Sequence, residues 1–240
     1  MKKIPVIVLV VLGLALAGVA DAANGKRKRT RNQNRVGPYV TGFIGMTSYS
    51  GDQSADEASL IDILDDAGVP FQNEKTSTED TDLGYSASFG YRFNRYVAGE
   101  LGLAQFGALT STLTADVDLP QDTEGFVPAR FEYSFHVGGP VISVLGMLPI
   151  KDKFEFYGRV GYLFASVERE FASKINGQRG LTGNAQGDSQ NLVYGAGITW
   201  NFTQVYSARA EYVILDDVGQ GNRTGKEDLS MLSIGMLVRF

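Results

Sequence analysis

The final stretch of the chain, residues 228–240, is the sequence feature that most constrains the fold. Every second residue in it is apolar, and these residues are Leu232, Ile234, Met236, Val238 and Phe240. The positions between them mix small, apolar and charged side chains, and Arg239 is among them. A period of two predicts a β-strand with two different faces. One fully apolar face and one mixed face suit a wall between lipid and a polar interior.

Seven earlier segments repeat this alternation, near residues 39–47, 83–93, 97–104, 131–148, 154–164, 191–202 and 206–214. The connections after the second, fourth and sixth segments are short, whereas those after the first, third, fifth and seventh are long and polar. Short turns at one rim and long loops at the other are typical of outer-membrane barrels. Because an open sheet edge would leave backbone groups unpaired in lipid, the sheet must close. The fold class predicted is all-β, an eight-stranded antiparallel up-and-down transmembrane β-barrel.

A soluble barrel or sandwich would also alternate, with its apolar face turned inward. Three features favour the membrane. The mixed face carries many charges and glycines, the apolar face carries aromatic residues near the strand ends, as an aromatic girdle requires, and the chain has an export signal. The 240 residues contain no cysteine, which excludes a disulfide framework and a lipidated cysteine.

The N-terminus carries that export signal. Lys2 and Lys3 precede an apolar run over residues 4–20, and an A-x-A site ends at Ala22. We predict a signal peptide over residues 1–22, because a membrane anchor of this kind would be short for a span. Its removal leaves 20 basic and 26 acidic residues, a net charge of −6. The localisation expected is the bacterial cell outer membrane.

Residues 23–35 hold six basic side chains and cannot form a core. We predict a disordered periplasmic tail there, with the barrel occupying residues 36–240. Attraction of the tail to anionic lipid headgroups is the alternative interpretation. Nucleic acid is not expected as a partner, since export removes it from the protein and no aromatic residue is interleaved with the basic ones.

Segment 131–148 changes its pattern at Gly138-Gly139-Pro140. The apolar side chains stand at odd positions up to Val137, and the better apolar set is even from Ile142 onward. One extra residue in a strand reverses the facing of all residues that follow. We therefore predict a β-bulge at these residues, with Glu132 and His136 facing the interior.

Five short stretches resemble a known family: residues 90–100 (GYRFNRYVAGE), 157–162 (YGRVGY), 194–197 (YGAG), 210–212 (AEY) and 238–240 (VRF). In this order and spacing, residues 36–240 resemble the OmpA-like transmembrane domain, a family of eight-stranded outer-membrane barrels. The resemblance implies an integral outer-membrane protein with a plugged, polar interior. It also implies that Phe240 is the signal read by the barrel-assembly machinery. The peptidoglycan-binding domain of some relatives is expected to be absent.

Eight strands enclose a space that side chains can fill, and charges there are costly unless paired. The predicted interior network consists of Arg92, Glu100, Glu132, Arg159, Arg209, Glu211 and Arg239. We expect Glu100 to pair with Arg159 or Arg92, and Glu211 with Arg209 or Arg239. The network is either a structural plug or a gated ion path, and the plug is the simpler interpretation.

Catalysis is not expected. The chain has one histidine, His136, and Ser134 stands two residues before it. Residues two apart on a strand lie about 6.5–7 Å apart, which makes a poor nucleophile and base pair. Segment 56–67 places apolar residues between acids and resembles a short amphipathic helix, but no calcium-loop pattern accompanies it. Neither a metal nor a cofactor is expected.

The sequence therefore predicts a non-enzymatic outer-membrane barrel with a structural or surface-interaction role carried by its long loops. A narrow, low-conductance pore is the alternative, and an adhesin or receptor role is a third. The partners expected are outer-membrane lipid, lipopolysaccharide and the barrel-assembly machinery, and the protein is expected to be a monomer.

Overall fold

The computed structural model describes residues 36–50, 70–118, 125–150, 153–220 and 225–240. The predicted signal peptide, basic tail and amphipathic helix 56–67 lie outside the described residues. The strands are β1 (Gly37–Tyr49), β2 (Phe71–Glu79), β3 (Thr81–Arg92), β4 (Val97–Asp118), β5 (Phe126–Pro149), β6 (Phe154–Ile175), β7 (Gln178–Asn201), β8 (Tyr206–Gln220) and β9 (Gly225–Arg239). Among these described parts, no helix is long and apolar enough to cross a membrane.

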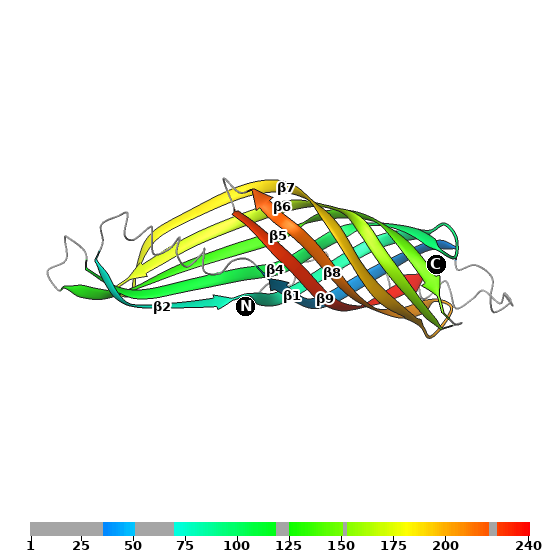
Figure 1. The fold of residues 1–240 in the computed structure, drawn as a ribbon, viewed down its shortest axis with the longest axis horizontal. Helices are drawn as coiled ribbons and strands as arrows, with labels where there is room; N and C mark the ends of the chain where they lie inside the picture. Colours follow the sequence, from blue (N-terminus) through cyan, green and yellow to red (C-terminus); the bar gives the residue numbers. More distant parts are fainter. Residues whose placement is uncertain (1–35, 51–69, 119–124, 151–152, 221–224) are drawn as a thin grey trace.

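The strands close into a ring. The sheet order is β2-β4-β3-β1-β9-β8-β7-β6-β5, and β4 also pairs with β5, so eight strands form the ring and β2 stands outside it. Every pairing is antiparallel, and the first and last strands meet in the register Tyr39↔Arg239. The predicted eight-stranded antiparallel barrel is confirmed, and Figure 1 shows the ring as the right-hand part of the molecule.

The outer surface of the ring is apolar. On β9 the residues Leu232, Ile234 and Met236 are 62%, 67% and 47% exposed, whereas Met231, Ser233 and Leu237 at the odd positions are buried. The same alternation leaves large apolar side chains exposed around the ring: Ile44, Leu83, Phe89, Leu101, Ile142, Val144, Val160 and Leu192. So broad an apolar surface is incompatible with water and matches the hydrocarbon of a bilayer.

Four strands continue far beyond the ring. Strands β4, β5, β6 and β7 are 22 to 24 residues long, and β2 pairs with the far half of β4. We call β2 together with residues 109–118, 126–137, 167–175 and 178–190 the outer extension; it forms the left-hand part of the molecule in Figure 1. Two of the predicted long loops are therefore largely strand. The connection between β6 and β7 is a tight turn at Asn176 and Gly177, both with positive φ.

The β-bulge lies on β4, so the predicted position on β5 was wrong. The register between β4 and β5 shifts between Gln105 and Ala108, where Gly107 has a φ of 78°. The odd-numbered residues of β5 face the interior along the whole strand, as the burial of both Val137 and Val141 shows. The odd apolar residues before Gly138 face the interior, which the sequence pattern alone assigned to lipid.

Two side chains hold the bulge in place. The Tyr49 hydroxyl donates a hydrogen bond to the Gly107 carbonyl oxygen (3.2 Å), and the Asp82 carboxylate accepts one from the Ala108 amide (3.0 Å). A Cβ on Gly107 would lie 2.9 Å from Asp82 Cβ and 3.0 Å from the Leu83 carbonyl oxygen. Glycine is required here by both its conformation and the close approach of β3.

Candidate functional site

The interior of the ring contains a charged layer near the short turns, built around Glu100. Its side chain is 1% exposed, and one carboxylate oxygen lies 2.7 Å from Arg159 Nη2. The other oxygen lies 2.7 Å from Arg209 Nη1 and accepts a hydrogen bond from the Tyr39 hydroxyl (2.8 Å). Strands β4, β6, β8 and β1 thus meet at one carboxylate across the ring.

Glu211 is the second carboxylate of the charged layer. Its Oε2 atom accepts hydrogen bonds from Arg159 Nη2 (3.1 Å) and from the Tyr157 hydroxyl (2.6 Å). Arg159 Nε lies 2.7 Å from Glu211 as well, an ion-pair distance without hydrogen-bond geometry. Arg159 therefore bridges both carboxylates, and of the two arginines considered for Glu100 it is the one in contact.

Glu211 was expected to pair with Arg209 or Arg239, but the arginine seen in contact with it is Arg159. Arg209 stands two residues from Glu211 on β8 and extends across the ring to Glu100 instead. Its guanidinium carbon lies 4.8 Å from the Tyr157 ring centre and 5.5 Å from that of Tyr39. The two rings take the place of further hydrogen-bond partners for this cation, an arrangement that favours a desolvated arginine.

Glycines on neighbouring strands make room for these tyrosines. Tyr39 stands opposite Gly90, and Tyr157 stands opposite Gly197. A Cβ on Gly90 would collide with the Tyr39 ring, and one on Gly197 would lie 2.5 Å from the Tyr157 hydroxyl oxygen. Inward glycines therefore let a large ring cross the lumen of a narrow barrel.

A separate ion pair lies at the rim with the short turns. Arg92 Nη1 donates to Glu155 Oε2 (2.9 Å), and both side chains are buried. Arg92 also donates to the carbonyl oxygens of Asn94 (3.1 Å) and Arg95 (2.6 Å), so it fixes the β3–β4 turn. Arg239 donates hydrogen bonds to Ser207 Oγ at 2.7 Å and to Asn201 Oδ1 at 3.0 Å.

Glu132 does not belong to this network. It lies on the outer extension, where its half-exposed carboxylate is 3.6 Å from Arg130. The physical reason is the position of the bulge: β5 keeps its odd residues inside, so the even residues Glu132 and His136 face outward. Ser134 shares this outward face, and within the described residues no hydrogen bond joins it to His136.

On the side of the charged layer away from the short turns, the interior is mainly apolar, although Thr47, Asn191 and Glu227 are also buried there. One buried cluster fills this half of the ring: Tyr49, Ala104, Phe106, Leu109, Phe135, Val137, Val141, Leu163, Ala165, Val167, Val193, Val213, Leu215, Val218, Leu229 and Met231. We call it the apolar layer. The plugged, polar interior implied by the family resemblance therefore describes the charged layer, whereas most of the outer half is filled by apolar side chains.

Sequence reasoning did not include Tyr39, Tyr157 and Glu155 in the network. Glu155 and Tyr157 have the same parity as Arg159 on β6, which is the signal that could have identified them. The apolar layer has no such signal, because an apolar residue facing lipid and one facing a packed lumen look alike in sequence. The described residues contain no group of three or more His, Cys, Asp or Glu side chains that could hold a metal.

The closed ring, its apolar outside and its paired interior charges agree with the comparison to known families. The model of the OmpA-like transmembrane domain matches residues 39–240. The chain belongs to this family. It is an outer-membrane β-barrel, and the localisation predicted from the sequence is confirmed.

Outer membrane protein A of Klebsiella pneumoniae is 27% identical over 176 residues, which are 72% of this chain and 45% of that protein. Outer membrane protein A of Yersinia pseudotuberculosis is 24% identical over 232 residues, which are 96% of this chain and 54% of that protein. The chain spans about half the length of these curated relatives.

Among solved structures, Neisserial surface protein A is similar with a TM-score of 0.43 at 13% identity, covering 85% of this chain and 97% of that one. OprG of Pseudomonas aeruginosa is similar with a TM-score of 0.43 at 12% identity, and the match covers 88% of this chain and 100% of OprG. The family assignment rests on the family match rather than on these likenesses.

Proposed function

We propose that the protein is a non-enzymatic outer-membrane barrel whose ring is a closed plug and whose outer extension carries a surface-interaction role. The observation that supports this most directly is the stacking of two filled layers in one lumen. The charged layer is held by paired, buried side chains, and most side chains of the apolar layer offer an ion no polar partner. An ion crossing the ring would have to break the ion pairs of the charged layer and enter the apolar layer without its hydration shell.

Planar-bilayer recording of the refolded protein tests the plug. We expect no openings, with insertion verified by heat-modifiable gel mobility and the bilayer verified by a porin of known conductance. Discrete openings would support the narrow pore instead. The conductance or frequency of such openings should then change when charged-layer residues are substituted, since the ion path has to pass them.

The non-enzymatic part of the proposal is supported by the position of His136 on the outward face of the extension. His136→Ala in an outer-membrane lipase or acyltransferase assay should leave any activity unchanged. A loss of activity in this variant, with gel mobility intact, would make the protein an enzyme and overturn this part.

The partners proposed are outer-membrane lipid and lipopolysaccharide around the apolar outer surface of the ring, and the barrel-assembly machinery at Phe240. The Phe240 side chain is 60% exposed, so a receptor could reach it. Phe240→Ser should lower the amount assembled in cells but leave refolding into detergent unchanged. Equal effects on both would mean that Phe240 acts through stability rather than recognition.

A further inference from the structure

The outer extension carries basic side chains in one line across its strands. Cross-strand pairing runs Lys75↔Thr114, Thr114↔Arg130, Arg130↔Lys174 and Lys174↔Arg179, so the line crosses β2, β4, β5, β6 and β7. We call the four basic residues of this line, Lys75, Arg130, Lys174 and Arg179, the basic row. Neighbouring strands are about 4.8 Å apart, so the row is about 19 Å long.

The basic row faces away from the packed side of the extension. On β4 and β5 the buried residues are Leu113, Ala115 and Ala129, which alternate with Thr114 and Arg130. All four basic residues are exposed. A shallow hollow of about 550 Å³ is lined by three of them, together with Asn73, Glu74, Thr114, Asp116 and Pro128. The row therefore borders a concave, accessible surface.

Like charges stand directly opposite one another in this row. Arg130 faces Lys174, and Lys174 faces Arg179, and such pairs destabilise a sheet when nothing lies between them. The acids nearby compensate only in part. Glu132 is 3.6 Å from Arg130, and Asp116 accepts a hydrogen bond from Asn73 (2.9 Å). Within the described parts of the chain, Lys75, Lys174 and Arg179 form no ion pair.

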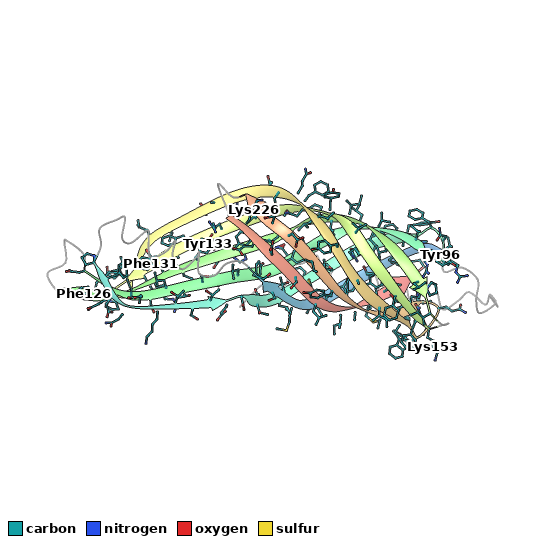
Figure 2. All side chains as sticks on the ribbon, in the orientation of Figure 1. Tyr96, Phe126, Phe131, Tyr133, Lys153 and Lys226 are labelled. Carbon is teal, nitrogen blue, oxygen red and sulfur yellow. The ribbon has the colours of Figure 1, made fainter. Side chains whose placement is uncertain are left out.

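The basic row lies far beyond the apolar outer surface of the ring that faces the membrane. The outward aromatic Phe164 on β6 is ten residues before Lys174, which corresponds to about 33 Å along the strand. Even with the usual tilt of about 45°, a lysine there cannot reach the headgroup phosphates of its own bilayer. In Figure 2, Phe131, the neighbour of Arg130 in the chain, lies well out along the extension.

We propose that the basic row binds a linear sulfated polysaccharide presented from outside the cell. The inference rests on the proposed surface role and names its partner. A linear polyanion matches a straight line of cations on successive strands and removes the repulsion between them. A nucleic acid fits less well, because the row has no exposed aromatic side chain for a base to stack on.

The test uses the full chain refolded into nanodiscs of zwitterionic lipid, with fluorescein-labelled heparin as the probe. We expect heparin to bind and unsulfated hyaluronan to bind at least tenfold more weakly. The double substitution Arg130→Gln with Lys174→Gln should weaken heparin binding about tenfold, and added salt should weaken it further. Arg130→Lys keeps the charge and should retain binding.

Lys226→Gln is the matched control, because Lys226 is an exposed lysine on β9 whose ammonium lies 3.4 Å from Asp217, away from the row (Figure 2). It should change heparin binding by less than about twofold. Absent heparin binding, an unaffected double variant, or an equal loss in the control would overturn the proposal.

Tight binding of single-stranded DNA with the same dependence on the row would make the partner a nucleic acid, and tight binding of lipopolysaccharide vesicles would make it a lipid phosphate. Either result overturns the proposal. The plug is tested separately by bilayer recording, so a barrel that is silent but does not bind heparin would retain the proposed closed ring and lose only the polysaccharide.

Discussion

Glu100 is the carboxylate on which two buried arginines depend. Glu100→Gln would remove the carboxylate that pairs with Arg209 and would leave Arg159 paired with Glu211. Breaking one member of a buried network typically costs about 3–5 kcal/mol, because the remaining charges stay desolvated. We expect this loss in the free energy of unfolding, measured by urea titration in lipid vesicles.

Glu132→Gln is the matched control for that change, since it removes the same charge from an exposed pair at 3.6 Å. Its effect should be below about 1 kcal/mol. If the two substitutions cost the same, the charged layer does not stabilise the ring as its geometry indicates.

The residues of the charged layer could be predicted from sequence better than their partners. Alternation places Glu100, Arg159, Arg209 and Glu211 on one face, because a strand has a period of two. The choice of ion-pair partner depends on where the strands that carry these residues stand around the ring. It also depends on which residues on the neighbouring strands are glycine. Gly90 and Gly197 decide that two tyrosine rings cross the lumen, and this is a property of strand register rather than of local pattern.

At the level of the strand, Gly107 is the residue that lets β4 change its facing. Gly107→Ala would force a side chain into a φ of 78° and against Asp82. We expect a loss of about 1–3 kcal/mol in the free energy of unfolding. Gly146→Ala is the control, because its Cβ would meet nothing within 4 Å, and its effect should stay within about 0.5 kcal/mol. Equal costs for both would mean that the bulge tolerates a side chain.

Strand β7 should divide into two parts in hydrogen exchange. Its residues 193–201 pair with both β6 and β8, whereas the part over 178–190 pairs with β6 alone among the described strands. Alternate amides of 180–190 therefore face an open edge and should exchange much faster than those of 193–201, as measured by NMR in nanodiscs. Uniformly slow exchange over 180–190 would mean that this edge is covered.

The alternating pattern predicted the existence of the ring strands but not their ends. Residues 109–118 carry only Thr and Asp on one side, and Ser111 stands among Leu, Ala and Val on the other, so they are polar enough to be taken for a loop. They form strand because β5 and β2 supply partners on both sides. The apolar outer half of the lumen was missed for a related reason, because an inward apolar face and a lipid face give the same period.

For the molecule as a whole, the ring and the outer extension should be separable. The two filled layers lie in the ring and in the first residues of the outer extension next to it, so their buried residues need little of the far ends of β4 to β7. We expect a chain in which residues 112–132 and 171–183 are each replaced by Asn-Gly to refold and keep its heat-modifiable mobility, because such turns suit the antiparallel pairs Ser111↔Tyr133 and Glu170↔Asn184. The same chain should lose heparin binding, since three of the four basic-row residues are removed. A shortened chain that fails to refold would mean that the extension helps to fold the ring, and a shortened chain that still binds heparin would place the binding surface on the ring.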